Sequence, residues 1–222
     1  MTEIYSYSKI NLYRTCPMQY DAKYVSKTVK FKPSAPAQWG TDVHKAGEDF
    51  INAKIPLAER YNLLQPYLDI LDKVEGVKQA EVEYGITKDL KPCSFFDKNA
   101  WLRGKLDVQI LQNDKAMIWD WKTGTAKPND FNELRCFSAL TFLNNPEVEK
   151  TKNTYIWLKN DSPPTTEIIK RSQVDELLEP LVATIDQIEE SMETGEFKPK
   201  PAGLCKNWCD VTMCKFHGRG RY

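Results

Sequence analysis

The chain has 222 residues, a length sufficient for one domain with a sizeable core. Its 31 basic residues balance 31 acidic residues, so bulk charge does not predict nucleic-acid binding. The first residues lack the apolar core of a signal peptide, and no run reaches the ~18 apolar residues that a membrane span needs. We therefore expect a cytoplasmic protein without membrane contact, in which the cysteines are ligands or thiols rather than disulfides.

The first third of the chain carries helical patterns that prolines interrupt. Ser8 is a favourable cap for a helix with apolar residues at helical spacing, and Pro17 predicts a bend or a restart. Thr41 opens a second helix after a loop with two prolines and a glycine, and Pro66 predicts a kink in a third. In chain order, we expect helix 8–25, loop 30–40, helix 41–52 and helix 57–74.

After residue 75 the apolar residues alternate, as they do in strands. Later helical patterns return, and the last of them has Ser172 as its cap and Gly195 at its end. The order of elements predicts an α/β fold with a central mixed sheet flanked by helices. The expected elements are strands 78–87, 101–111 and 115–123, helix 130–143, strands 153–159 and 165–171, and helix 172–195.

We expect one domain, residues 1–222, built of successive segments. The last segment differs in composition, because the chain becomes rich in proline, lysine and cysteine after the long helix. The segments are an N-terminal helical region 1–75, a sheet core 76–170, the long helix 171–194 and a basic, cysteine-rich tail 195–222.

Two acidic residues and a lysine stand at corresponding places on neighbouring strands. Asp107 and Asp120 each close an apolar run, and Lys122 follows two residues later on the same strand face. Two carboxylates on adjacent strands can share Mg²⁺ or Mn²⁺, which prefer oxygen ligands. Such a metal with a nearby ammonium is sufficient for phosphodiester cleavage. The alternative is that these charged residues simply meet solvent where the strands end.

The surrounding residues resemble the RecB-like branch of the PD-(D/E)xK nucleases. That branch has G-x-x-D on one strand and (D/E)-x-K on the next, and this chain has Gly104 to Asp107, then Asp120 and Lys122. It also has a histidine in a G-x-x-x-H setting, which the stretch "GTDVH" supplies as His44. The resemblance implies a restriction-endonuclease-like core in which His44, Asp107 and Asp120 bind the metal. Lys122 would then act on the attacking water or on the transition-state charge.

Further positions follow from the same resemblance, with two departures from it. The family has Q-x-x-x-Y on the next helix, where this chain has Glu133 and Phe137. Glu81 and Glu83 share a face of the first strand: in one interpretation one of them approaches the site, and in the favoured one the face is exposed. Residues that would orient a ligand or contact DNA are Glu48, Glu83, Glu133 and Arg135, with Lys105 and Lys127 also able to reach a DNA backbone.

The cysteines form a second signal. Cys205, Cys209 and Cys214 lie within ten residues of the tail, and Cys16 lies near the other end. AddB and the CRISPR-associated and viral exonucleases show one early and three late cysteines that hold a [4Fe–4S] cluster, so the resemblance implies such a cluster joining the N- and C-terminal segments. The late spacing here, C-x₃-C-x₄-C, departs from the family's C-x₂-C-x₅-C. The alternatives are zinc, bound by four cysteines or by three with His217, and unrelated thiols.

The resemblance implies a Mg²⁺- or Mn²⁺-dependent deoxyribonuclease, and exonuclease action on single-stranded or end-bearing DNA. A helicase, recombination or CRISPR-adaptation protein would be its partner. The chain has no G-x-x-x-x-G-K-[ST] motif for a motor of its own. The alternative is a non-catalytic DNA-binding or partner-binding module on a nuclease-like fold with a zinc site.

Overall fold

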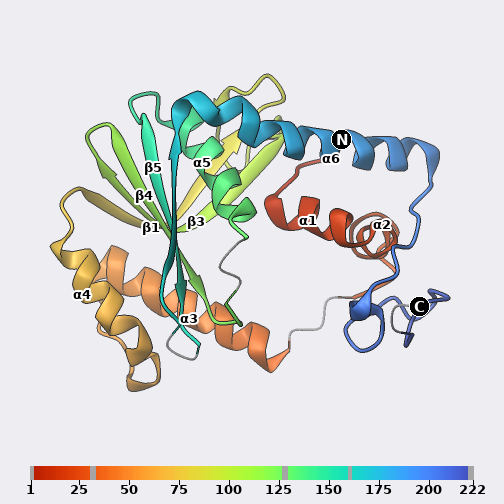
Figure 1. The fold of residues 1–222 in the computed structure, drawn as a ribbon, viewed down its shortest axis with the longest axis horizontal. Coiled ribbons are helices and arrows are strands. Elements are labelled where there is room, and N and C mark those ends of the chain that lie inside the picture. The colour runs from red at the N-terminus through yellow and green to blue at the C-terminus, as the bar shows by residue number, and fades with distance from the viewer. Residues whose placement is uncertain (1–2, 31–33, 127–129, 160–161, 220–222) are drawn as a thin grey trace. The chain divides into compact units, whose positions relative to one another are not determined.

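The computed structural model describes residues 3–30, 34–126, 130–159 and 162–219 (Figure 1). The chain divides into two compact units, and the boundary falls inside the long helix α6 (Val174–Thr194). Unit 1 comprises Met1–Ile4 and Pro33–Leu178, and unit 2 comprises Tyr5–Lys32 and Glu179–Tyr222. The expectation of a single domain with four segments stays a prediction.

Unit 1 contains a mixed sheet with the strand order β2-β1-β3-β4-β5-β6. Strands β4 and β5 run parallel, and the other neighbours pair antiparallel. The sheet confirms the α/β class predicted from the sequence, and each expected strand is present within a few residues. The strands are β1 (Val77–Ile86), β2 (Pro92–Cys93), β3 (Leu102–Gln112), β4 (Lys115–Lys122), β5 (Lys150–Trp157) and β6 (Thr165–Lys170).

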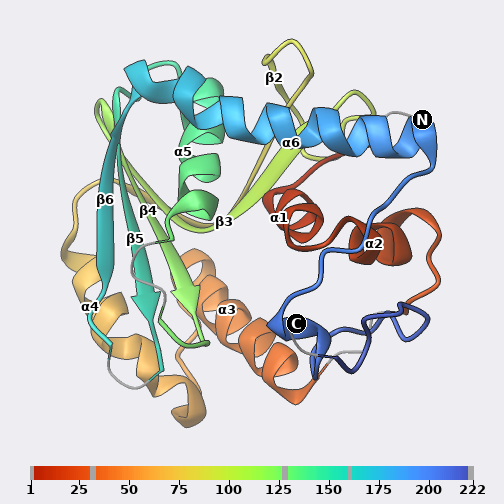
Figure 2. The ribbon, with the colours of Figure 1, turned by 45° about the vertical axis from the view of Figure 1, so that its right-hand side comes forward.

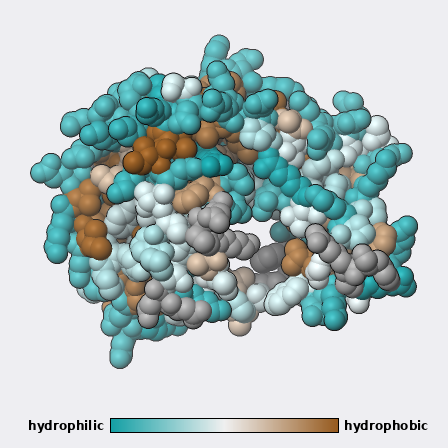
Figure 3. Space-filling view, in the orientation of Figure 1, coloured by the Kyte–Doolittle hydropathy of each residue, from teal (hydrophilic) through white to brown (hydrophobic). Residues whose placement is uncertain are grey.

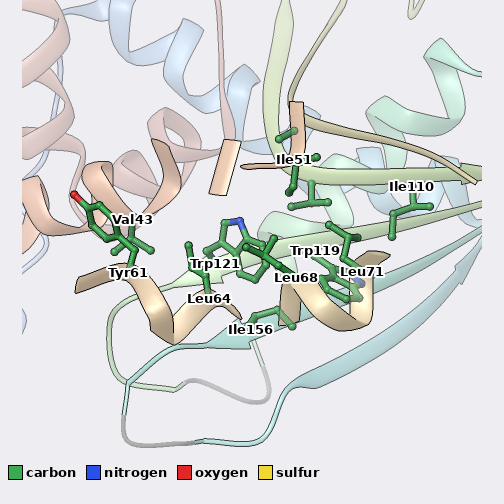
Figure 4. Packing of buried hydrophobic residues seen from close by; sticks show 12 residues of the cluster. Val43, Ile51, Tyr61, Leu64, Leu68, Leu71, Ile110, Trp119, Trp121 and Ile156 are labelled. Atoms are coloured by element: carbon green, nitrogen blue, oxygen red, sulfur yellow. The ribbon is translucent and has the colours of Figure 1, made fainter. Parts of the chain in front are cut away.

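Helices cover both faces of this sheet. Figures 1 and 2 show α3 (Ala35–Ala53) and α4 (Gln65–Lys73) on one face and α5 (Asn132–Asn144) on the other. A short 3₁₀ helix, Glu59–Leu64, connects α3 and α4 on the first face. Buried apolar residues form a cluster between α3, α4 and the sheet. Because burial of apolar surface is the main driving force of folding, this cluster stabilises unit 1. The cluster is drawn in Figure 4 and includes Val43, Ile51, Leu64, Leu68, Leu71, Ile110, Trp119, Trp121 and Ile156.

The start of α3 differs from the sequence prediction. The helix begins at Ala35 and not at Thr41, because Ser34 caps it by accepting a hydrogen bond from the backbone of Ala37. Its Pro36 lies in the first turn, where a missing N–H costs nothing. Pro66 likewise lies in the first turn of α4, so it starts that helix and does not kink one.

Unit 2 holds α1 (Tyr7–Thr15), α2 (Pro17–Tyr20), a π-helical turn Asp21–Val25 and the later part of α6. The predicted restart at Pro17 is confirmed, since Cys16 leaves the helical conformation and α2 begins after it. The cap of α1 is Ser6 and not Ser8. A polar contact joins α1 to α6, because the Tyr13 hydroxyl donates to the carbonyl of Gln187, 2.9 Å away.

The two ends of α6 differ in how well they were predicted. Its cap is not Ser172, which lies inside a preceding 3₁₀ turn, Arg171–Gln173. The end is as expected, because Gly195 follows the helix with a left-handed φ of 72°.

The surface is rich in charged side chains, as the composition requires. Hydrophilic residues dominate the face that Figure 3 shows, with small hydrophobic patches between them. Among the helices of the described residues, none combines the length and the apolar character that crossing a bilayer requires.

Gly104 of β3 is expected to tolerate no side chain. A Cβ there would lie 2.6 Å from Leu140 Cδ1 and 3.1 Å from the Phe137 ring on α5. Gly104→Ala should therefore lower the free energy of unfolding by about 1–3 kcal/mol, measured by urea denaturation. Gly124→Ala is the matched control, because no described atom beyond its chain neighbours lies within 4 Å of its Cβ position. Equal stabilities of the two variants would contradict this packing.

Candidate active site

The pairing between β3 and β4 stops where the two acidic residues of the motif begin. The last paired residues are Val108 and Trp119, so Asp107 has no ladder partner on β4. Its carboxylate instead accepts a hydrogen bond from the backbone N–H of Trp121, 2.8 Å away. The sequence had suggested that Asp107 ends its strand, but Asp107 lies in the middle of β3. Its side chain contacts the backbone of β4 where the two strands separate.

The pairing between β1 and β3 is irregular at the same level. The register passes over one pair of opposed residues, Glu81 and Asp107. Glu81 has a left-handed backbone with a φ of 57°, which is rare for residues other than glycine and clusters at functional sites. In a regular strand, Ala80 and Tyr84 would lie on the same face of the sheet. Here Ala80 packs under α3 and α4, whereas Tyr84 receives a hydrogen bond from Asn145 at the end of α5, on the other face. The irregularity directs the Glu81 carboxylate toward Asp107.

His44 of α3 reaches this point from the helix above the sheet. Its Nδ1 lies 3.1 Å from Asp107 Oδ1, and its Nε2 donates to the carbonyl oxygen of Trp121 at 2.9 Å. Burial lowers the pKa of His44, but the hydrogen bond and negative charge of Asp107, with the charge of Asp120, outweigh it and raise the pKa to about 9. The same negative charge that favours a proton on this ring favours a metal cation beside it.

A group of three side chains can therefore hold a metal ion. One ligand atom from each of His44, Glu81 and Asp107 lies within 4.8 Å of the others. Glu81 was not among the predicted site residues, and Glu83, which was, is not in the group. Alternation along β1 assigns the two glutamates to one face, and the left-handed backbone that selects Glu81 has no signature in the sequence.

Asp120 lies at the end of β4 and is almost fully buried. Burial raises its pKa well above the usual carboxyl value, and the negative charge of Asp107 adds to this while Lys122 opposes it. Its Oδ2 is 2.7 Å from Lys122 Nζ, but that contact lacks hydrogen-bond geometry, and Oδ2 accepts no hydrogen bond from the described residues. A buried carboxylate oxygen with this free capacity is the kind of atom that coordinates a cation.

Lys122 lies between two carboxylates. Its Nζ is 2.7 Å from Asp120 Oδ2 and 2.7 Å from Glu133 Oε2, which comes from the first turn of α5. The Tyr155 ring lies below, with its centroid 5.2 Å from Nζ. Burial opposes the charge, but the two carboxylates raise the pKa of Lys122 above its usual value, so the side chain is an ammonium.

Among the other predicted residues, Lys105 contacts Glu81 of the metal-binding group, whereas Glu48 and Arg135 pair with residues outside it. Glu48 pairs with Lys45 at 3.2 Å, so the imidazole of the site is oriented by other residues. Arg135 pairs with Glu167 on β6, with Nε 3.0 Å from Oε2. Lys127 lies outside the described residues. Of the weaker candidates in the described ranges, Glu133 is the one that contacts a motif residue, Lys122.

In unit 2 the four predicted cysteines line one pocket. Cys16, Cys205, Cys209 and Cys214 all face it, together with His217. The backbone of Lys200 donates to Cys16 Sγ and that of Ala202 donates to Cys205 Sγ, both at 3.4 Å. Burial raises the pKa of Cys209, and the neighbouring thiols add to this.

The four thiols line one pocket, but they are less tightly grouped than the ligand atoms of His44, Glu81 and Asp107 in unit 1. In the portion of the chain that the structure describes, no three ligand atoms from cysteine or histidine in this pocket come within 4.8 Å of one another. The cysteines are free rather than joined in disulfides, as expected. The structure thus brings the predicted residues to one place, and the group that they bind stays a prediction.

A divalent metal should stabilise unit 1 through Glu81. At a Mn²⁺ concentration about 100 times the dissociation constant, the stabilisation is ~2.7 kcal/mol, which raises the melting temperature by about 5–10 °C. Glu81→Gln should abolish most of that rise, whereas Glu83→Gln on the same strand should keep it. Scanning calorimetry with Mn²⁺ and with a chelator measures both, and the reverse ranking of the two variants would contradict the assignment of Glu81 as a ligand.

Comparisons with known proteins identify a family and related folds. A family model described as the PD-(D/E)XK nuclease superfamily matches residues 4–214. No curated protein matches the sequence significantly. Among solved structures, a "putative exonuclease" from Eubacterium rectale is 14% identical with a TM-score of 0.56, over 96% of this chain and 90% of that one. The fold is thus shared across nearly both whole chains.

Two further solved structures are similar at lower scores. SSO0001 is 13% identical with a TM-score of 0.48, over 98% of this chain and 88% of that one. LHK-Exo in complex with dAMP is 11% identical with a TM-score of 0.44, over 85% and 89%. The family match covers almost the whole sequence, including all the motif residues described above. The chain belongs to the PD-(D/E)XK nuclease superfamily.

Proposed function

We propose that this protein is a metal-dependent deoxyribonuclease that acts on single-stranded DNA or on DNA with free ends, and that it works as an exonuclease. The observation that supports the proposal best is the convergence of the motif residues at the break between β3 and β4. Asp107, Asp120, Lys122 and His44 come from three separate elements, and Glu81 joins them from a fourth. The alternative is that the charged residues of the motif simply meet solvent where the strands end. That alternative explains neither the burial of Asp120 nor the left-handed backbone of Glu81.

The donor set fits a hard divalent cation. His44, Glu81 and Asp107 would hold it, with Asp120 Oδ2, which accepts no hydrogen bond from the described residues, as a further ligand. Carboxylate-rich sites select Mg²⁺ or Mn²⁺ over softer metals, and Mn²⁺ also accepts an imidazole. The chemistry that such a cation supplies is a lowered pKa for water and stabilisation of negative charge on a phosphodiester.

Lys122 would stabilise charge rather than accept a proton. Two carboxylates hold its ammonium in place and keep it protonated, so it can donate a hydrogen bond to a phosphoryl oxygen. Glu133 stands where the family has glutamine, yet it contacts Lys122 directly. The departure from the family pattern therefore keeps this residue in the site and does not favour a non-catalytic module.

A groove beside the site supports a strand of DNA as substrate. It is lined by one face of α3, including Thr41 and His44, and by Glu81 and Lys105, with a volume of about 520 Å³. Pockets that take small ligands have volumes of ~300–1,000 Å³, so the groove has room for a short stretch of one strand. This favours a single strand or a strand end as the substrate.

For the cysteine pocket we propose a [4Fe–4S] cluster, which would link Cys16 to the C-terminal tail. Tetrahedral zinc with Zn–S distances of ~2.3 Å needs sulfur atoms about 3.8 Å apart. The four cysteines line one pocket, and the choice of the larger cluster over such a zinc site rests on the family resemblance. The backbone N–H donors to Cys16 and Cys205 are of the kind that tune such clusters.

The same proposal covers the organisation of the chain. The two units would form a single cytoplasmic nuclease domain in which the cluster ties the first helices to the tail. Because the chain has no motif for a nucleotide-driven motor, a helicase, recombination or CRISPR-adaptation protein would deliver the DNA.

Lys122→Gln should lower the rate of DNA cleavage by about 10²–10³-fold, the usual loss for one transition-state donor. The assay is cleavage of end-labelled single- and double-stranded DNA with Mn²⁺, and the product ladder shows whether attack begins at an end. Lys115→Gln, an exposed lysine at the other end of β4, is the matched control and should keep full activity.

Removal of Lys122 alone leaves Asp120 buried without a cation, which can unfold the protein. The double variant Asp120→Asn/Lys122→Gln removes both charges and should fold without cleaving DNA. A folded variant of either kind with wild-type activity would refute the role given to Lys122.

Protein purified without oxygen should be brown and contain iron and sulfide. Cys209→Ser should lose iron, visible absorbance and melting temperature, whereas Cys93→Ser on β2 should keep all three. Elemental analysis and visible absorption measure the outcome. Zinc in place of iron in the wild-type protein would establish the zinc alternative instead.

A further inference from the structure

The groove beside the candidate active site carries two lysines with different partners. Lys105 Nζ is 2.6 Å from Glu81 Oε2, the carboxylate that also belongs to the metal-binding group. Lys45 Nζ is 3.2 Å from Glu48 Oε2 and also pairs with Asp49, neither of which is in that group. One lysine therefore competes with a metal for its ligand, and the other does not.

The Lys105–Glu81 contact crosses the strand pair on a diagonal. In the β1–β3 register Lys105 is opposite Glu83, yet its ammonium turns to Glu81. The left-handed backbone of Glu81 brings the carboxylate to this place. The ammonium thus neutralises an acid whose backbone is strained and whose side chain is 19% exposed.

A cation at this site would weaken the contact between Lys105 and Glu81. A carboxylate that binds a divalent ion brings that ion close to the Lys105 ammonium, and like charges repel strongly at such separations. The Lys105 side chain is 46% exposed on the wall of the groove, so it can swing away without unfolding its surroundings. A strand of DNA in the groove offers a phosphate to such an ammonium.

Resting on the proposed function, we propose that Lys105 is a DNA-backbone contact controlled by the metal site. It covers Glu81 while the site lacks a metal, and it exchanges Glu81 for a phosphate of the bound strand when Glu81 turns to the cation. Metal binding and DNA binding would then be coupled, each favouring the other, because both require the same ion pair to open.

The first test is Mn²⁺ binding without DNA, measured by titration calorimetry or by the loss of the free Mn²⁺ paramagnetic resonance signal. Lys105→Gln removes the competitor for Glu81, so it should bind Mn²⁺ at least about threefold more tightly than wild type. Lys45→Gln removes an equal charge from the same groove and should change the affinity much less. Equal tightening in both variants would indicate general electrostatics and overturn the proposal.

The second test is binding of a labelled oligothymidylate with Ca²⁺ and with a chelator. Ca²⁺ prefers the same oxygen ligands. Wild type should bind the oligonucleotide more tightly with Ca²⁺, and Lys105→Gln should lose that gain. The variant's salt dependence in Ca²⁺ should also fall by about one unit of slope, as for one phosphate contact. A Ca²⁺ gain that is unchanged in Lys105→Gln would overturn the proposal.

The two proposals fail in different ways. A folded wild type that neither binds Mn²⁺ nor cleaves DNA would refute the metal-dependent nuclease and this inference with it. A wild type that does both, with Lys105→Gln indistinguishable from it in Mn²⁺ and oligonucleotide binding, would refute the role of Lys105 alone.

Discussion

The candidate site depends on one hydrogen bond, from the backbone N–H of Trp121 to the carboxylate of Asp107. A central strand normally satisfies its backbone through a ladder partner, because an unpaired buried N–H is costly. Here a side chain replaces that partner at the level where β3 and β4 separate. The strands can therefore part without an orphaned donor, and the opening holds Asp107 and Asp120 close to His44.

The second constraint on the site is charge. Four carboxylates, from Glu81, Asp107, Asp120 and Glu133, face three cationic groups on His44, Lys105 and Lys122. Buried acids this close together raise one another's pKa, and the cations offset this. Each cation has a different position relative to the proposed metal. His44 would be one of its ligands and Lys105 contacts the ligand Glu81, whereas Lys122 pairs with both Asp120 and Glu133, which would hold it in place when Lys105 moves.

The sequence predicted the strands, the α/β class and the residues of the two motifs, because alternation and the G-x-x-D and D-x-K spacings are local signals. It missed Glu81, since its selection over Glu83 depends on one left-handed residue and on a register gap between β1 and β3. It also started α3 too late, because Pro36 reads as a loop residue until the Ser34 cap is known. The four cysteines were predicted as a group, and the pocket that they share is formed by chain segments almost two hundred residues apart.

The central claim is that His44, Glu81 and Asp107 would hold a divalent cation, which would stabilise negative charge on the phosphodiester that is cleaved. The most direct test replaces one non-bridging oxygen of a labelled strand with sulfur and compares cleavage at that linkage with Mg²⁺ and with Cd²⁺. Sulfur is a soft ligand, so the account predicts that cleavage is lost with Mg²⁺ and restored with Cd²⁺ for one of the two sulfur stereoisomers. Equal cleavage of the oxygen and sulfur linkages with Mg²⁺, or cleavage without any divalent metal, would contradict the account.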